Sequence, residues 1–225
     1  MKTTLPFLLF VLLVVQPAFG ADLNGTDDFN DNSRDSTKWG ADIVLGTCSI
    51  AETNQQLQLS TAAVGTNCVV FRPWILNTAS SNLDWEIIAT VNNNATPGLT
   101  NDQTCDIGLA VGNSAAISDY VYVGLYASTL GSPRLRRGFV SGLAVNTVDI
   151  AVADSLDMGV TGGAVRLLFN SGARVITSYY DVGGNGGGYI WVKLGSFGVA
   201  GNNGETGNAN WNAAPVALKL LTVAP

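Results

Sequence analysis

The chain has 225 residues and a formal net charge of −6 at pH 7, with 12% charged residues and no histidine. The acidic balance argues against nucleic acid as a partner, because phosphate binding requires clustered cations. The lack of histidine excludes Ser-His-Asp and Cys-His catalysis and zinc sites of the His/Cys type. The length suits one β-rich domain with a full hydrophobic core.

The first twenty residues have the three parts of a cleavable secretory signal peptide. Lys2 supplies a positive charge, residues 5–15 are almost wholly apolar, and Ala18 is a small residue near a cleavage point. A membrane anchor is the alternative, but it needs about 20 apolar residues, and no later stretch is long and apolar enough to span a bilayer. We therefore expect residues 1–20 to be a signal peptide and residues 21–225 to be one exported domain, secreted, periplasmic or held at the cell surface.

Short segments with alternating apolar and polar side chains follow, separated by clusters of Gly, Asn, Asp and Ser. The predicted strands are residues 48–52, 56–60, 68–71, 85–91, 106–111, 120–126, 136–141, 145–152, 165–169, 174–180, 189–194 and 216–222. Thr53-Asn54-Gln55 predicts a hairpin turn, as does the glycine-rich stretch 183–188. These strands, without an amphipathic helix pattern, predict an all-β protein built as a two-sheet antiparallel sandwich.

Alternation also assigns side chains to the two faces of a strand. In residues 120–126 the aliphatic side chains share the predicted core face and the tyrosines share the other. Arg166 points away from the core by the same pattern. In residues 189–194 the aliphatic side chains at 190, 192 and 194 are expected to point inward, and Trp191 and Lys193 outward. If these strands belong to one sheet, its outer face carries Tyr120, Tyr122, Tyr126, Arg166, Trp191 and Lys193.

The chain contains three cysteines, Cys48, Cys68 and Cys105. In an oxidising compartment two of them can pair and leave one thiol. Cys48 and Cys68 are the favoured disulfide, because the segment between them has the pattern of two successive turns that bring them into neighbouring strands. The sequence by itself leaves the pairing open.

The order of the segments carries a resemblance. The chain has Asp-Asp-Phe-Asn-Asp-Asn at 27–32, Asp-Ser-Thr-Lys-Trp at 35–39 and Glu-Thr-Asn-Gln-Gln-Leu at 52–57. Together with the later strands, this order resembles secreted concanavalin A-like lectin/glucanase domains, the jelly-roll group that includes laminin-G-like modules. The resemblance spans nearly all of residues 21–225. It implies two curved antiparallel sheets, in a group where many members bind glycans, often with a calcium ion.

Calcium is the one cofactor that this resemblance suggests. Asp27, Asp28, Asn30 and Asp31 concentrate the oxygen ligands that Ca²⁺ prefers, near the position where jelly-roll domains often hold an ion. The same run is also typical of a solvated turn, and its spacing does not match an EF-hand. These four residues are therefore candidate calcium ligands.

An enzyme is the least favoured function. Laminarinase-like members of the group place carboxylates at alternate positions on one strand, and retaining hydrolysis needs two of them about 5 Å apart. The only glutamates here, Glu52, Glu86 and Glu205, are far from one another in the sequence, and Asp149, the nearest substitute, lies toward a strand end. The sequence thus predicts no catalytic residue, and we expect a non-enzymatic protein rather than a glycoside hydrolase.

Carbohydrate binding is the favoured function. Sugars stack their C–H faces on aromatic rings and exchange hydrogen bonds with amides, carboxylates and guanidinium groups. The predicted ligand-binding residues are Tyr122, Arg166 and Trp191, supported by Tyr120 and Tyr126. For each of these aromatic residues burial under a loop is the structural alternative. A structural or adhesive surface protein without a small ligand is the second function that fits the sequence.

Overall fold

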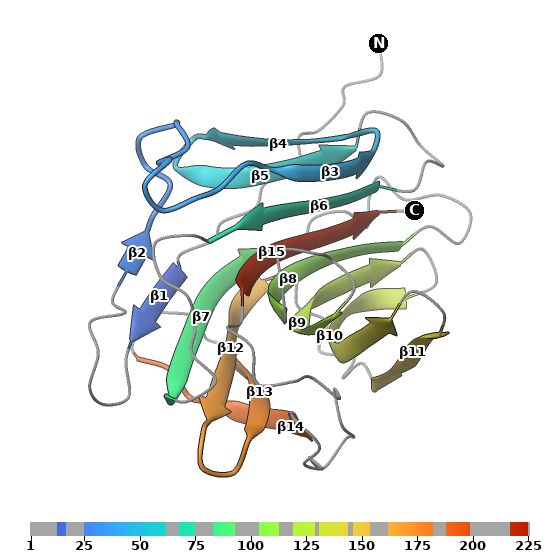
Figure 1. Cartoon of the computed structure of the whole chain (residues 1–225). Helices are drawn as coiled ribbons and strands as arrows, with labels where there is room; N and C mark the ends of the chain where they lie inside the picture. The colour runs from blue at the N-terminus through green and yellow to red at the C-terminus, as the bar shows by residue number, and fades with distance from the viewer. Residues whose placement is uncertain are drawn as a thin grey trace.

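The computed structural model of this chain describes residues 13–16, 25–61, 68–74, 83–92, 104–112, 119–128, 131–143, 146–153, 162–181, 188–198 and 217–224. The regular secondary structure in these ranges consists of β-strands alone, and all strand pairs are antiparallel. The predicted all-β, antiparallel class is therefore confirmed (Figure 1). No helix long and apolar enough to cross a bilayer occurs in the described ranges.

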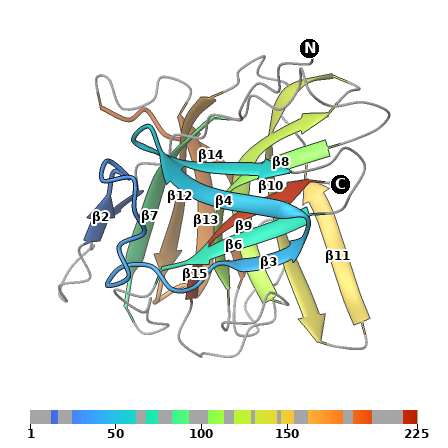
Figure 2. The same ribbon diagram turned by 90° about the horizontal axis from the view of Figure 1, so that it is seen from above.

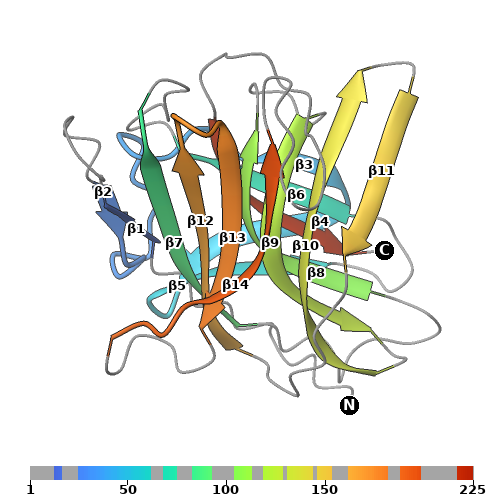
Figure 3. The same ribbon diagram turned by 90° about the horizontal axis from the view of Figure 1, so that it is seen from below.

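One sheet has six strands in the order β14-β13-β12-β7-β1-β2. Its strands are β1 (Leu13–Gln16), β2 (Gly25–Asp27), β7 (Trp85–Asn92), β12 (Gly162–Asn170), β13 (Val175–Asp181) and β14 (Val192–Gly198). Figure 3 shows β7, β12 and β13 running side by side as one layer, with β9 and β10 in the other layer.

The second sheet has seven strands in the order β11-β10-β9-β8-β15-β6-β3. Its strands are β3 (Ile43–Gly46), β6 (Cys68–Pro73), β8 (Thr104–Gly112), β9 (Asp119–Ser128), β10 (Gly131–Leu143), β11 (Asn146–Ala153) and β15 (Ala217–Ala224). Strand β15 thus lies inside the sheet, between β6 and β8, although it is far from both in the sequence.

A separate hairpin consists of β4 (Cys48–Thr53) and β5 (Gln56–Thr61). Figures 1 and 2 place β4 beside β3 and β6. Its turn is Asn54-Gln55, where both residues have positive φ angles of 54° and 60°. Two positive φ angles in a two-residue loop match the right-handed twist of the flanking strands. The predicted hairpin turn at this point is confirmed.

The core lies between the two sheets and contains side chains from both. Val121, Val123 and Leu125 of β9 are fully buried. Val165 and Leu167 of β12 belong to the same cluster. Burial of each such aliphatic side chain stabilises the fold by about 1.5–3 kcal/mol relative to exposure. The faces predicted for β9 and β12 by alternation are therefore correct.

The prediction for residues 189–194 is partly wrong. Ile190 is 80% exposed and Val192 is 51% exposed, although both were expected to point inward. Ile190 precedes β14, which begins at Val192. Within the β13–β14 ladder the register changes, so that Leu194 has no residue of β13 opposite it. Such a bulge reverses the alternation of inward and outward side chains. Leu194 packs against the core, as expected.

Strand β1 lies within the segment that we predict to be the signal peptide. It pairs with residues 86–89 of β7 on one side and with β2 on the other. Cleavage before Ala21 stays a prediction. A mature chain that lacks β1 would expose the backbone of β7 along this edge, because no other described strand pairs with it there.

Candidate functional site

The five predicted ligand-binding residues lie on two different sheets. Tyr120, Tyr122 and Tyr126 belong to β9 of the seven-stranded sheet, whereas Arg166 belongs to β12 of the six-stranded sheet. Trp191 immediately precedes β14, beside β13. The condition for one shared outer face, that these strands belong to one sheet, is therefore not met. Alternation defines the face of a single strand, but it carries no information on which strands are neighbours.

Tyr122 is covered on its face of the seven-stranded sheet. Its side chain is 6% exposed and forms a small apolar cluster with Phe71 and Ala110 on the side opposite the main core. The ring of Tyr122 is therefore buried rather than exposed, and a role for it in ligand binding stays a prediction. The side chains of Tyr120 and Tyr126 lie outside the described residues.

Arg166 forms an ion pair across two strands of the six-stranded sheet. Its Nη2 donates a hydrogen bond of 2.9 Å to Oε2 of Glu86 on β7, and each side chain is 18% exposed. The register places Glu86 opposite Leu168 on β12, so the pair spans neighbouring rungs of the ladder. The ion pair holds the guanidinium plane in place on the outer face.

Two aromatic rings pack against this guanidinium group, and a third stacks on one of them. Cζ of Arg166 lies 5.0 Å from the ring centroid of Tyr179 and 5.5 Å from that of Trp191. Trp191 in turn stacks on Tyr189, with centroids 4.6 Å apart and ring planes at 28°. Cation–π contacts of this kind contribute about 0.5–2 kcal/mol each. We call Arg166, Tyr179, Tyr189 and Trp191 the aromatic platform; all four are partly exposed.

Two members of the aromatic platform were not predicted. Tyr179 lies opposite Arg166 in the β12–β13 ladder, and alternation within residues 174–180 could have placed it on the outer face. Tyr189 belongs to the predicted strand 189–194, where alternation with Trp191 and Lys193 could have placed it on the outer face. Burial, and next the negative charge of Asp181, raise the pKa of Tyr189 above its ordinary value. Its phenol therefore keeps its proton at neutral pH and can donate a hydrogen bond.

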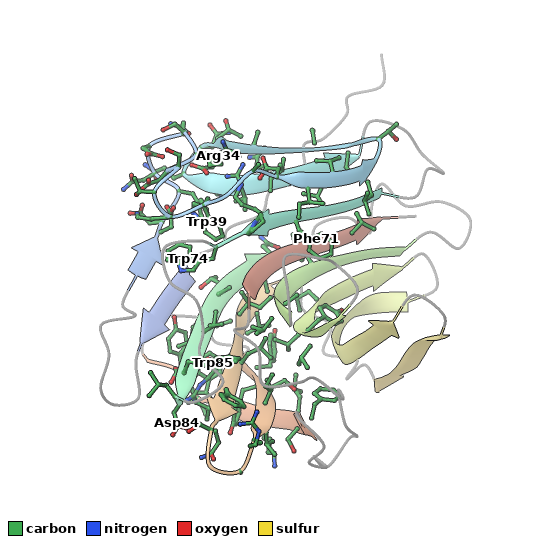
Figure 4. The ribbon with its side chains drawn as sticks, viewed as in Figure 1. Arg34, Trp39, Phe71, Trp74, Asp84 and Trp85 are labelled. Carbon is green, nitrogen blue, oxygen red and sulfur yellow. The ribbon has the colours of Figure 1, made fainter. Side chains whose placement is uncertain are left out.

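The candidate calcium ligands anchor a loop. Oδ1 of Asp27 accepts a hydrogen bond of 2.9 Å from the backbone N–H of Phe29, and Oδ2 accepts one of 2.6 Å from Nε1 of Trp39. Trp39 also packs edge-on against Trp74, with centroids 4.7 Å apart (Figure 4). Asp27 thus fixes the position of a buried indole.

The other three candidate ligands make local contacts. Asp28 accepts a hydrogen bond of 2.7 Å from Nδ2 of Asn30, and Asp31 accepts one of 3.1 Å from the backbone of Ser33. These are side-chain turns of the kind that Asp and Asn form in loops. No group of three or more His, Cys, Asp or Glu residues is arranged to hold a metal ion in the part of the chain that is described. Calcium binding stays a prediction.

A buried ionic cluster lies beside this loop. Arg72 on β6 donates hydrogen bonds to both carboxylate oxygens of Asp42, at 2.8 and 3.1 Å, and to Oε1 of Glu52 on β4. The Glu52 side chain is 2% exposed, and its Oε2 has no hydrogen-bond partner. Burial raises the pKa of Glu52 to about 7, although the charge of Arg72 opposes the shift.

Cys48 is disulfide-bonded. In the β3–β6 ladder Gly46 lies opposite Cys68. Cys48 follows Gly46 by two residues, so its backbone lies near that of Cys68. This register favours Cys68 as the partner, and the pairing itself stays a prediction.

The chain matches no protein-family model and no curated protein sequence. Its class is therefore defined by the fold and the site alone. It is an all-β protein of sandwich type, whose six-stranded sheet carries an arginine stacked against two aromatic rings on the outer face.

Proposed function

We propose that this chain is an exported, non-enzymatic β-sandwich protein that binds carbohydrate through the aromatic platform. The stacking of Arg166 with Tyr179 and Trp191 is the observation that carries the proposal. Partly exposed aromatic rings offer flat apolar surfaces to the C–H faces of a sugar, while the guanidinium and phenol groups supply hydrogen bonds to its hydroxyls. The ion pair with Glu86 preorganises the arginine, so less side-chain entropy is lost on binding.

The proposal includes export and a concanavalin A-like jelly roll. The disulfide at Cys48 supports export, because disulfides persist in oxidising compartments. Two facing antiparallel sheets, with the last strand β15 inserted between β6 and β8, support a jelly-roll arrangement, since such folds need long connections between strands that become neighbours.

A structural or adhesive role is the alternative function. The edge strand β3 carries Val44 and Leu45, which are 41% and 45% exposed. An edge strand with exposed apolar side chains can pair with a strand of another chain. A protein of this kind would retain no free glycan, and a glycoside hydrolase would convert the glycan rather than retain it.

Binding to a glycan array, followed by calorimetry with each retained glycan, tests the proposal. Trp191→Ala should weaken binding about tenfold, because a stacked ring is lost from a binding surface. Arg166→Met should also weaken binding, whereas Arg34→Met is the matched control, since Arg34 lies in the exposed loop before Trp39. Retention of no glycan, or equal affinity of Trp191→Ala and the unaltered chain, would refute carbohydrate binding at this site.

A further inference from the structure

Among the described residues the two sheets have four edge strands, and β3 is the one without a charged residue. The edge strands are β14 and β2 in the six-stranded sheet, and β11 and β3 in the seven-stranded sheet. β14 contains Lys193, β11 contains Asp149 and β2 ends at Asp27, whereas Ile43–Gly46 is uncharged. A charge on an edge strand opposes pairing with the edge of another sheet. This protection is absent from β3.

β3 also lacks the backbone irregularities that protect an edge. The β13–β14 and β10–β11 ladders each change register once, so the edge strands β14 and β11 belong to irregular ladders. The β3–β6 ladder is regular from Ile43 to Gly46, and β3 contains no proline. Bulges and prolines on an edge strand block pairing with a further strand. The free edge of β3 is therefore a regular strand to which another strand can be added.

The free edge of β3 is open on both faces of the sheet. Val44 lies opposite Val70, which belongs to the main core, and Leu45 lies opposite Val69 on the other face. Val44 is nevertheless 41% exposed, and Leu45 is 45% exposed. Gly46 is also exposed, so the neighbouring hairpin β4–β5 leaves this edge accessible. An exposed apolar edge with unpaired backbone groups is a template for a strand of another chain.

The charges that flank β3 in the sequence are neutralised within the chain. Asp42, just before β3, accepts two hydrogen bonds from Arg72, at 2.8 and 3.1 Å. The next charged residue after β3 is Glu52, which is buried and also pairs with Arg72. Like charges directly opposite each other destabilise a strand pair. Two copies of β3 therefore meet without this repulsion, which makes a second copy of the chain a suitable partner for the edge.

We propose that β3 pairs with β3 of a second copy of this chain, antiparallel and about a two-fold axis at Val44. An axis perpendicular to the sheet keeps each side chain on its own face, so Val44 meets its own copy and Ile43 meets Leu45. Apolar residues thus face apolar residues, whereas an axis at Leu45 would place Val44 opposite Gly46. The pairing forms about four backbone hydrogen bonds, because every second residue of an edge strand has free N–H and C=O groups.

This pairing joins the seven-stranded sheets of two copies into one continuous sheet. Because the axis is perpendicular to that sheet, both six-stranded sheets lie on the same side of it. Figure 1 shows β3 at the end of the sandwich far from β14, so the two aromatic platforms lie at opposite ends of the dimer. A long glycan that reaches both platforms would bind with higher avidity than a short one. The avidity rests on the proposed function, whereas the pairing of β3 does not.

Sedimentation velocity on the purified protein, over loading concentrations from about 1 to about 300 μM, tests the pairing. Four residue pairs form a small interface, so we expect monomer at the lowest concentrations and dimer at the highest. Val44→Lys should weaken dimerisation about tenfold or more, because the two added charges would face each other across the axis. Leu83→Lys is the matched control, since Leu83 is 38% exposed and lies outside β3.

Oxidative cross-linking tests the register. Directly opposite residues of an antiparallel pair have Cα atoms about 4.5–5.5 Å apart, which is within reach of a disulfide. Val44→Cys should give a covalent dimer on a non-reducing gel, whereas Leu83→Cys and the unaltered chain should not. A monomer at every concentration, equal dimerisation of the two lysine variants, or equal cross-linking of the two cysteine variants would overturn this inference. Each of these results would leave carbohydrate binding standing, and a lack of glycan binding would leave the dimer standing.

Discussion

Replacement of the buried Glu52 by glutamine should change how the stability of the protein depends on pH. Glu52 is 2% exposed, pairs with Arg72 through one oxygen and leaves the other without a partner. Burial raises its pKa from 4.5 to about 7. The negative charges of Asp27 and Asp31 act in the same direction, and the charge of Arg72 acts against it.

The sign follows from the difference between the folded and unfolded states. The folded protein holds the Glu52 proton more tightly than the unfolded chain, so this group contributes stability that is fully present below pH 4.5 and is lost as pH rises to about 7. A rise from 4.5 to about 7 corresponds to a loss of at most about 3 kcal/mol, since one pKa unit equals about 1.4 kcal/mol and the opposing charge of Arg72 is already included in that rise. That is a substantial part of a typical stability of about 5–15 kcal/mol.

Urea denaturation followed by tryptophan fluorescence at pH 4.5, 6 and 8 measures this dependence. The free energy of unfolding of the unaltered protein should fall across the series, and Glu52→Gln should flatten it. Asp84 does not interfere, because its hydrogen bonds to Ser171 lower its pKa below 3.8, so its contribution is lost only at more acidic pH. Glu86→Gln is a control at a less buried glutamate. If Glu52→Gln and Glu86→Gln give the same pH profile as the unaltered chain, burial of Glu52 does not control its ionisation.

Two further substitutions test the packing that the structure shows. Gly124→Ala should destabilise the protein by about 3 kcal/mol or more, or prevent folding, because its β-carbon would overlap the backbone of β8 at Ile107. Gly172→Ala, whose β-carbon would have its nearest neighbour at 3.5 Å, should change the urea midpoint little; equal effects would contradict the close approach. Asp27→Ala should lower the free energy of unfolding by about 2–3 kcal/mol, since it removes the acceptor of two buried hydrogen bonds. Asp28→Ala, at an exposed position, should lower it far less, and the opposite order would refute the anchoring role of Asp27.

Sequence patterns were informative wherever the signal was local. Alternation located β7, β9 and β12 and assigned their core faces, because successive side chains of a strand point to opposite faces whatever its neighbours are. The turn at Asn54-Gln55 was also local, since two residues that tolerate positive φ suffice for a tight hairpin. The same reasoning missed β3, a short edge strand whose exposed Val44 and Leu45 show no alternation of burial.

The candidate site depended on contacts between segments far apart in the chain. Arg166 and Trp191 were identified from the sequence as outward residues, and the structure brings them together with Tyr179 and Tyr189. Tyr122 lies on the other sheet and is buried against Phe71 and Ala110. Its neighbours are decided by how the strands pair, which the pattern of its own strand does not show.

By itself, the amino-acid sequence determined that this protein is built of short β-strands with one apolar face, since side-chain periodicity is a property of each segment. Only the tertiary structure decided which strands share a sheet, and therefore which outward residues meet. The bulge that leaves Val192 exposed and the ion pair that neutralises Arg166 both arise from register between strands. Register depends on the turns that join the strands and on the fit of their apolar faces around one core, so the pattern of a single strand does not fix it.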